Sequence, residues 1–309
     1  MIVVTGGLGF IGNELVRQLI QAGEKVAVID NRNRVAPHIE DLSGVEVYEA
    51  DIINKERIKE IFISIQPHTV YHLAAIHYIP ECNANPERTL RINVEGTESV
   101  LNAAAAAGVG KFIFASSGAV YADSAEKLTE SSEISPVDIY GWSKLFGEQL
   151  CLLNFQVNKT PTVICRLFNN YGPRETNMHI IPEVLYQLSM GNTLQLGNIT
   201  TTRDYIHTKD CATAMIKLAA CTGSDVKTVN VAHGNGYTVK EMIDRISEIS
   251  GRVVSVTADD SRVRKVDKQT QVANIELLHA LTGWRPQTSI QKGLKELLEF
   301  ENSLKIVAS

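Results

Sequence analysis

A tyrosine and a lysine four residues apart form the pair in this sequence best suited to move a proton. Tyr140 and Lys144 occur in the segment Tyr-Gly-Trp-Ser-Lys, and on a helix this spacing places both side chains on one face. A phenol loses its proton near pH ~10 in water, and neighbouring positive charge stabilises the phenolate. The pair therefore predicts a base in a cleft. The alternative is two polar residues on an exposed helix.

Context decides between this pair and a second one, because Tyr205 and Lys209 have the same spacing. Tyr140 follows an expected strand, 111–116, whose carboxyl end carries hydroxyl side chains, and open parallel sheets bind ligands at the carboxyl ends of their strands. Tyr205 instead precedes a threonine suited to cap a helix. The chemistry is therefore assigned to Tyr140 and its lysine.

The chain opens with an apolar strand that runs into glycines, a pattern typical of a dinucleotide-binding loop. The strand expected at 2–5 leads into Thr-Gly-Gly-Leu-Gly-Phe-Ile-Gly, which ends at Gly12. Glycines permit a tight turn, let the main chain approach a pyrophosphate, and let the helix pack on the strand. The helix expected at 13–22 then directs unpaired N–H groups at the anion. Ordinary turns also contain glycine clusters, so the surroundings must agree.

Asp30 bears on which dinucleotide is bound. It ends the second expected strand, 25–29, and follows Gly12 by eighteen residues. A carboxylate near this spacing accepts hydrogen bonds from the adenosine ribose and would repel the 2′-phosphate of NADP. Arg32 and Arg34 keep NADP open as an alternative, because a guanidinium group pairs with a phosphate. The sequence favours NAD.

Composition excludes several classes of protein. The 309 residues include 30 basic and 35 acidic side chains, a net charge of −5, which gives no electrostatic reason to bind nucleic acid or an anionic membrane. Apolar runs are too short to span a membrane, and no basic region precedes the first strand, so we expect a cytoplasmic protein. The five cysteines form no C-x-x-C pair. We therefore expect no disulfide framework and no metal site.

Strand and helix patterns alternate through the first half of the chain. The expected strands are 2–5, 25–29, 45–49, 69–73, 111–116 and 162–168. This order predicts an α/β fold, a Rossmann-type doubly wound parallel sheet with a smaller mixed α/β C-terminal substrate lobe. The expected dinucleotide-binding domain is 1–171, joined by about 204–231, and the expected substrate lobe is 172–203 with 232–309.

Three helices are expected in the second half. One covers 181–190. The next begins with a capping box at Thr238 and Glu241 and ends at Gly251. The last is expected to open in the segment Thr-Ser-Ile-Gln, residues 288–291.

Several motifs together resemble the extended short-chain dehydrogenase/reductase family. They are the glycine loop, the strand followed by hydroxyl residues, the Tyr140 motif, the segment Arg-Asp-Tyr-Ile-His ending at His207, and Gly-Trp-Arg-Pro ending at Pro286. The resemblance covers nearly the whole chain and is closest in kind to UDP-sugar 4-epimerases of the NAD-dependent epimerase/dehydratase group. It implies that NAD⁺ takes a hydride from a nucleotide-diphosphate sugar while the tyrosine takes the hydroxyl proton.

The resemblance also implies a set of site residues. The catalytic residues would be Ser117, Tyr140 and Lys144, with Ser116 as the alternative to Ser117. The cofactor-binding residues would be Gly6, Gly9, Phe10, Ile11, Gly12, Asp30, Asn31, Asp51, Ile52, Leu73, Ala74, Ala75, Asn93, Tyr140 and Lys144. The substrate-binding residues would be Tyr78, Gly118, Asn169, His179, Leu196, Arg203, Arg264 and Asp267.

Three of these residues have simpler explanations. Asn93 would serve equally well as a cap at a helix start. Arg264 lies in a basic run, and such runs are usually solvated loops. His179 stands where the family pattern has asparagine, and such a histidine is more often simply packed.

The reaction is inferred from the residues directly after the catalytic serine. The family's dehydratases carry Asp-Glu and its decarboxylases carry Glu at a position where this chain has Gly118 and Ala119. Without a carboxylate, elimination lacks its acid and base. The leading hypothesis is therefore epimerisation at carbon 4 through a transient 4-keto sugar.

Other reactions stay open. Leu196 replaces an aromatic residue that often stacks on uracil, and the element around it resembles that of GDP- and CDP-sugar dehydratases. The segment 77–82 adds acid–base groups that would suit elimination, or epimerisation at carbon 3 or 5. A non-catalytic NAD-sensing protein is the alternative of a different class. The resemblance also implies a homodimer, formed through the helix after Asn93 and the helix that carries Tyr140.

Overall fold

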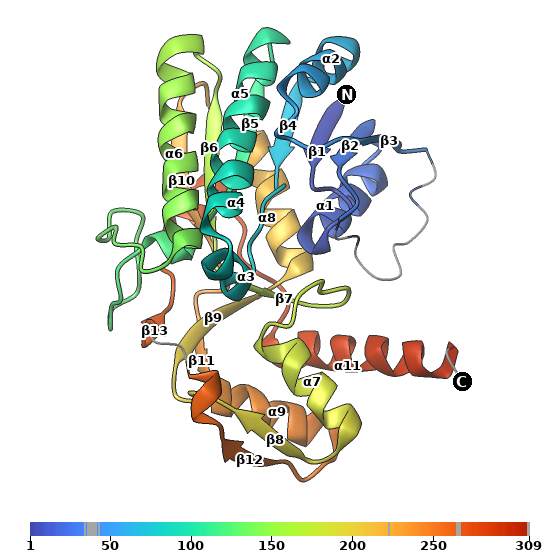
Figure 1. Ribbon diagram of the computed structural model, residues 1–309, viewed down its shortest axis with the longest axis vertical. Helices are drawn as coiled ribbons and strands as arrows, with labels where there is room; N and C mark the ends of the chain where they lie inside the picture. Colours follow the sequence, from blue (N-terminus) through green and yellow to red (C-terminus); the bar gives the residue numbers. More distant parts are fainter. Residues whose placement is uncertain (34, 36–41, 43, 222, 264–266, 308–309) are drawn as a thin grey trace.

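A seven-stranded parallel sheet forms the centre of the computed structural model, which describes residues 1–33, 35, 42, 44–221, 223–263 and 267–307 (Figure 1). The strand order is β10-β6-β5-β4-β1-β2-β3, and every neighbouring pair is parallel. The strands are β1 (Ile2–Thr5), β2 (Val26–Asp30), β3 (Glu46–Glu49), β4 (Thr69–His72), β5 (Lys111–Ser117), β6 (Thr162–Leu167) and β10 (Val226–Val231). The sequence predicted the first six and missed β10.

Helices cover both faces of this sheet. Helices α1 (Phe10–Gln21) and α8 (Thr208–Cys221) bury their apolar sides in one core cluster, and α2 (Lys55–Ile65), α5 (Gly96–Ala106) and α6 (Ile139–Asn158) bury theirs in another. Successive side chains of a strand point to opposite faces. Accordingly, Val4 lies in the first cluster and Val3 in the second. A parallel sheet covered on both faces is the predicted doubly wound fold.

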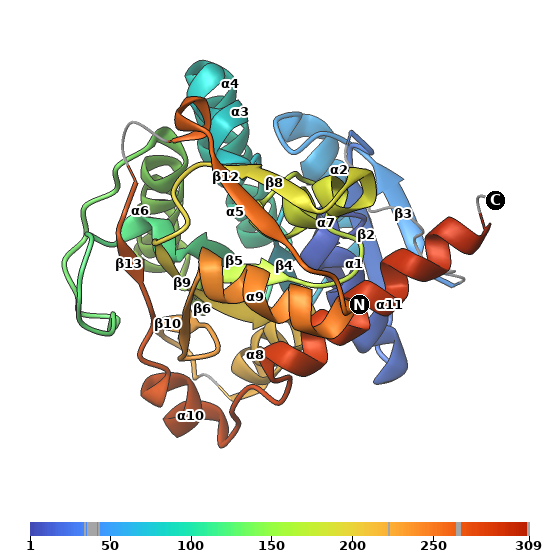
Figure 2. The same cartoon turned by 90° about the horizontal axis from the view of Figure 1, so that it is seen from below.

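A second, smaller lobe lies below the large sheet (Figure 1). Strand β9 (Thr202–His207) pairs with β7 (Asn169–Tyr171), β11 (Gly236–Thr238) and β13 (Thr270–Gln271), while β8 (Thr193–Leu196) pairs with β12 (Ser255–Ala258). Helices α7 (Ile180–Met190), α9 (Val239–Ser250) and α11 (Ile290–Val307) pack in its core. Figure 2 shows this lobe from below, in front of the sheet. Because β11 is antiparallel to β9 while β7 and β13 are parallel to it, the lobe is mixed as expected.

Short helices complete the fold. They are α3 (Ile79–Ala84), α4 (Pro86–Leu90), a π-helical turn (Arg91–Glu95), two 3₁₀ turns (Gly118–Val120 and Asp260–Arg262) and α10 (Glu276–Thr282). Among the helices of the described residues, none is both long enough and apolar enough to cross a bilayer.

Helix boundaries follow the predicted capping chemistry with one exception. The Thr238 capping box is present, and α9 stops at Gly251, whose φ is +67°. The first helix begins earlier than predicted, at Phe10, because the chain becomes helical directly after Gly9. The last helix, α11, begins at Ile290, inside the predicted opening segment 288–291, and the hydroxyl of Ser289 accepts the N–H of Lys292 at 3.3 Å.

A buried aspartate joins three segments of the chain. The carboxylate of Asp204, on β9, accepts N–H groups from His233 at 2.8 Å, Gly234 at 2.9 Å and Ala273 at 3.2 Å. Burial raises the pKa of Asp204 to about 7. Because one side chain accepts all three N–H groups, the loop after β10 and the segment after β13 are held against β9.

Replacing this carboxylate should weaken the fold. Asp204→Asn leaves one acceptor oxygen for three buried donors, and an unsatisfied buried group costs ~1–3 kcal/mol. The effect should depend on pH. The folded-state pKa of Asp204, about 7, lies above the ~3.9 of an exposed aspartate, so its contribution to stability falls as pH rises from about 4 to about 7.

Denaturant unfolding at pH 5 and pH 8 measures both effects. The stability difference between wild type and Asp204→Asn should be larger at pH 5. Asp244→Asn, which changes an exposed carboxylate paired with Lys240, is the control. Equal stability of wild type and Asp204→Asn at pH 5 would refute this account.

Candidate functional site

A cleft of about 1390 Å³ opens at the carboxyl ends of the parallel strands. Its wall includes the segments that follow β1, β2, β3, β4, β5 and β6, together with residues of the smaller lobe. Parallel strands place their carboxyl ends at one edge of a sheet, where ligands of open α/β folds bind. The cleft is therefore the candidate site.

The turn between β1 and α1 has no space for side chains. A Cβ atom at Gly12 would lie 2.1 Å from the carbonyl oxygen of Gly6, and one at Gly6 would lie 2.8 Å from the nitrogen of Ala74. The φ of Gly6 is +70°, a conformation that favours glycine. The turn is thus held against the end of β4, and the first N–H groups of α1 lie at the cleft. This cradle fits a dinucleotide pyrophosphate.

Asp30 sits at the end of β2 with its carboxylate held in place. It accepts N–H groups from Leu8 at 3.1 Å and Arg32 at 2.8 Å, and burial raises its pKa. The guanidinium of Arg32 pairs with Glu49 at 3.3 Å. Arg32 is therefore engaged by a carboxylate, while Arg34, the other residue that kept NADP open, lies outside the described residues.

Tyr140 and Lys144 stand on the first turns of α6, which the side chain of Asp138 caps by accepting the N–H of Gly141 at 2.7 Å. The Nζ atom of Lys144 lies 5.9 Å from the centre of the Tyr140 ring and donates to the carbonyl of Ala115 at 2.8 Å. The Ser117 hydroxyl lies close enough to the phenol to lower the pKa of Tyr140. The three predicted catalytic side chains are thus brought together at the end of β5.

Burial shifts the two pKa values in opposite directions. It raises the pKa of Tyr140, an effect opposed by the nearby Ser117 hydroxyl, and lowers the pKa of Lys144 to about 8. Desolvation disfavours each separate charge. The sequence predicted that positive charge lowers the pKa of Tyr140. In the protein without a bound cofactor, burial outweighs this effect.

Most predicted site residues line the cleft. Those on its wall are Gly6, Gly9, Phe10, Ile11, Gly12, Asp30, Asn31, Asp51, Ile52, Leu73, Ala74, Ala75, Tyr78, Ser117, Gly118, Tyr140, Lys144, Asn169, His179, Arg203 and Asp267. Ser116 also lines it, and its hydroxyl is bound to Glu148 at 2.5 Å. Arg264 lies outside the described residues.

Asn93 lies behind the wall instead of on it. Its Oδ1 accepts the N–H of Ile76 at 2.8 Å, and its Nδ2 donates to the Ile76 carbonyl at 2.8 Å and the Ser143 hydroxyl at 2.9 Å. Because Asn93 is inside the π-helical turn, the alternative of a cap at a helix start is wrong. It fixes the segment after β4 against α6.

Leu196 is also away from the cleft. On β8, Leu194 and Leu196 are buried while Thr193 and Gln195 are exposed, the alternation of a strand with one covered face. The Leu196 side chain packs in the core of the smaller lobe. The position expected to meet the nucleotide base is therefore a core position.

Two residues predicted to contact the substrate, one its diphosphate and the other its ribose, bind each other instead. The Arg203 guanidinium pairs with the Asp267 carboxylate at 2.7 Å. Beside them, Lys268 donates to the carbonyl of Ala119 at 2.8 Å, and burial lowers its pKa to about 8. Gln271 donates to the carbonyl of Gly118 at 2.9 Å. Sequence reasoning missed Lys268 and Gln271, because these contacts join segments far apart in the chain.

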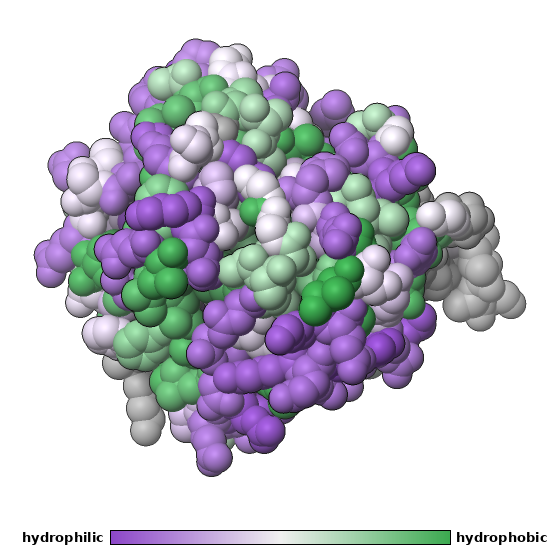
Figure 3. Space-filling model, turned by 90° about the horizontal axis from the view of Figure 1, so that it is seen from above, coloured by the Kyte–Doolittle hydropathy of each residue, from purple (hydrophilic) through white to green (hydrophobic). Residues whose placement is uncertain are grey.

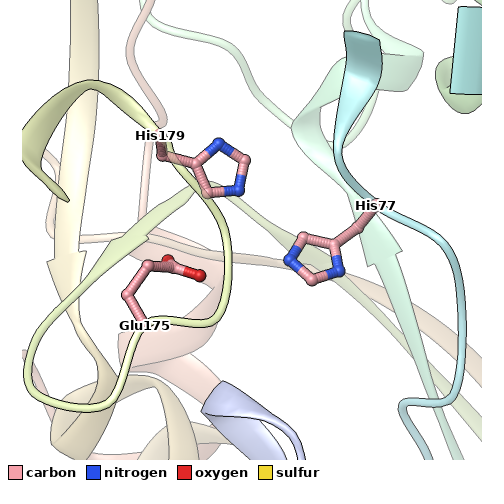
Figure 4. Close-up of side chains that lie close together, drawn as sticks. All are labelled: His77, Glu175 and His179. Atoms are coloured by element: carbon pink, nitrogen blue, oxygen red, sulfur yellow. The ribbon is translucent and has the colours of Figure 1, made fainter. Parts of the chain in front are cut away.

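A second polar cluster was also missed as a unit. Glu175 accepts N–H groups from Thr176 at 2.8 Å and Asn177 at 3.1 Å, and burial raises its pKa to about 7. The rings of His77 and His179 are 5.7 Å apart. Figure 4 shows the side chains of Glu175, His77 and His179 around one space. The sequence signalled both histidines but not their proximity to the glutamate.

Comparisons with known proteins agree with this fold. A UDP-glucose 4-epimerase of Rhizobium meliloti is 30% identical, with 93% of this chain and 92% of that protein covered. A GDP-6-deoxy-D-mannose reductase of Pseudomonas aeruginosa is 28% identical, with 96% and 95% covered. The structure of a UDP-glucose 4-epimerase of Thermus thermophilus in complex with NAD is similar with a TM-score of 0.88, 27% identity and coverage of 97% and 98%.

Family membership is shown by a match along most of the chain. Residues 2–232 match the model described as the NAD dependent epimerase/dehydratase family. This range includes the glycine turn, Asp30 and the Tyr140 motif, and it confirms the prediction of NAD as the cofactor. The chain belongs to the NAD-dependent epimerase/dehydratase family.

Proposed function

We propose that this protein is an NAD-dependent nucleotide-diphosphate-sugar epimerase that inverts carbon 4 through a transient 4-keto sugar. The observation that carries the proposal is the placement of Ser117, Tyr140 and Lys144 on the wall of the cleft that also contains the glycine turn. The similarity to UDP-glucose 4-epimerases supports this reaction.

The cofactor would lie along the strand ends. The turn from Gly6 to Gly12 would hold the pyrophosphate, Asp30 the adenosine ribose, and Asp51 with Ile52 the adenine. When bound, NAD supplies the acceptor and donor of the sugar's hydride. The segment 73–75 lines the same wall, next to the glycine turn.

Tyr140 is the proposed base. It would take the proton of the sugar's carbon-4 hydroxyl and return it after the keto sugar has turned over. Ser117, whose hydroxyl lowers the pKa of the phenol, would stabilise the phenolate. Lys144, with a pKa of about 8, is largely protonated at pH 7 and supplies positive charge one helical turn away.

The surroundings of Ser117 argue against elimination. A Cβ atom at Gly118 would lie 3.1 Å from the ring of Phe168, so this position has little space for the carboxylate that a dehydratase requires.

Reduction of a GDP-linked keto sugar is the second candidate, favoured by the similarity to the Pseudomonas reductase. Reduction would consume reduced cofactor and add two hydrogens to the sugar, whereas epimerisation leaves its mass unchanged.

The substrate would occupy the part of the cleft nearer the smaller lobe. The proposed contacts are Tyr78, Gly118, Asn169, His179, Arg203 and Asp267, all on the cleft wall. Because Arg203 is paired with Asp267, a diphosphate would compete with that carboxylate for the guanidinium. Guanidinium groups bind phosphate oxygens in pairs, which suits this exchange.

A homodimer through α6 is also part of the proposal. Trp142, Phe146, Leu153 and Val157 lie on one side of α6 and are 44%, 42%, 54% and 69% exposed. Tyr140 and Lys144 lie on the other side, toward the cleft. Figure 3 shows hydrophobic side chains reaching the surface among hydrophilic ones. An apolar stripe of this kind marks a helix that packs against a partner.

Gly12→Ala tests the cofactor cradle. The added methyl group would overlap the carbonyl of Gly6, and overpacking costs about 1–3 kcal/mol, so NAD affinity should fall roughly ten- to hundredfold. Calorimetric titration with NAD measures this. Gly191→Ala is the matched control, because a Cβ atom there meets nothing within 4 Å. Unchanged NAD affinity in Gly12→Ala would contradict the cradle.

Tyr140→Phe tests the base. Loss of a general base should lower kcat by about 10²–10⁴-fold while NAD remains bound. Tyr205→Phe is the control, because its hydroxyl is buried and without a hydrogen-bond partner in the described residues. Conversion of UDP-glucose to its 4-epimer, followed by chromatography and mass spectrometry, provides the readout. An active Tyr140→Phe enzyme would remove Tyr140 from the reaction, and a product with altered mass would exclude epimerisation.

The double variant Phe146→Glu/Leu153→Glu tests the dimer. Two buried carboxylates would oppose association, so light scattering should give the mass of one chain, against twice that mass for wild type. Ile63→Glu, which places a charge at a position 51% exposed on α2, should keep the wild-type mass. A monomeric wild type at micromolar concentration would refute the dimer.

A further inference from the structure

Three side chains with metal-binding atoms converge in the wall of the cleft. His77 comes from the segment after β4, while Glu175 and His179 come from the segment between β7 and α7. One possible ligand atom of each lies within 4.8 Å of the others. In Figure 4 the carboxylate and the two rings point toward the same space.

Their chemistry fits a divalent transition-metal ion. Two imidazole nitrogens and one carboxylate oxygen form a donor set that Zn²⁺ uses in sites with an open position. Bonds of ~2.0–2.1 Å hold tetrahedral ligands roughly 3.4 Å apart. The possible ligand atoms of the three residues lie within 4.8 Å of one another, so small side-chain rotations would bring them to this spacing. We infer that His77, Glu175 and His179 form a binding site for a divalent transition-metal ion such as Zn²⁺.

The environment of the Glu175 carboxylate favours binding of a cation. Its side chain is partly buried and, within the described part of the chain, has no ion-pair partner. Its two backbone hydrogen bonds both go to Oε1, so Oε2 is the oxygen left for an ion. Removing a carboxylate from water is costly unless a cation or further hydrogen bonds compensate it.

The surroundings of the histidines favour the same ligand. The amide of Asn177 lies with its Nδ2 3.0 Å from Nε2 of His77. In that arrangement the amide donates and the ring nitrogen accepts, so this nitrogen carries the lone pair that a metal ligand needs. Metal binding would replace that hydrogen bond. The rings of Tyr78 and His179 meet edge to face, with ring centres 5.5 Å apart, which restricts the orientation of the His179 ring.

A metal ion bound at this site would contact a molecule bound in the part of the cleft nearer the smaller lobe. All three residues line the same cleft as Tyr78 and Tyr140. Three protein ligands leave a four-coordinate ion one position for water or for an oxygen atom of a bound molecule. The inference is independent of the epimerase proposal, because it requires neither NAD nor a sugar.

Zinc binding is measured on chelator-treated full-length protein, with Zn²⁺ titrated against a chromophoric competitor. Cys221→Ser serves as the background, because Cys221 is an exposed thiol that would bind zinc on its own. We expect one ion per chain. Loss of an outer-shell partner weakens metal binding roughly 10–100-fold. We expect a larger loss of Zn²⁺ affinity from each substitution of a direct ligand, namely His77→Gln, Glu175→Gln and His179→Gln. Co²⁺ in place of Zn²⁺ should give visible absorption that these variants lose.

His68→Gln is the matched control, because His68 is exposed and outside the cleft, and it should bind Zn²⁺ as the background protein does. Circular dichroism melting verifies that each variant is folded. Absence of a stoichiometric ion in the folded background protein would overturn the inference. Equal zinc affinity in the folded His179→Gln protein would also overturn it.

Discussion

The parallel direction of seven strands is the constraint on which the site depends. Because every strand of the large sheet runs the same way, the segments that leave β1 to β6 reach one edge and form one wall of the cleft. Residues separated by more than a hundred positions, such as Gly12 and Tyr140, thereby share one cavity. Covering helices on both faces bury the sheet and leave this edge as the place where polar groups collect.

Close contacts behind the wall fix the geometry at this edge. The glycine turn leaves no space for a methyl group between Gly6 and the chain after β4. Asn93 ties Ile76, in that same segment, to α6. Lys144 ties α6 to the carbonyl of Ala115 on β5. The glycine turn, the segment after β4 and α6 are thus linked to one another by direct contacts and hydrogen bonds.

Local patterns predicted the parts of this arrangement that depend on neighbouring residues. Apolar runs predicted six strands, and the glycines, Asp30 and the Tyr140 motif predicted the wall of the cleft. The remaining features depend on contacts across the chain. Strand β10 mixes apolar and polar residues and is recognisable only beside β6. Leu196 is buried because β8 covers the core of the smaller lobe.

Local sequence patterns also failed to predict contacts between charged side chains. The sequence assigned Arg203 and Asp267 separate contacts, but they are within 2.7 Å of each other. Glu175 had no local signal at all. Its proximity to His77 arises from the packing of two segments that are about a hundred residues apart in the sequence.

The two tyrosine–lysine pairs show why spacing acquires meaning only through secondary structure. Tyr205 lies on β9 and Lys209 on α8, where the lysine pairs with Glu296. Tyr140 and Lys144 lie on one face of a single helix, in a place where burial penalises the phenolate and the ammonium ion separately. Attraction between opposite charges strengthens as the local dielectric constant falls. Burial therefore makes the charge of each group depend more strongly on other charges nearby, and positive charge on a bound nicotinamide would favour the phenolate.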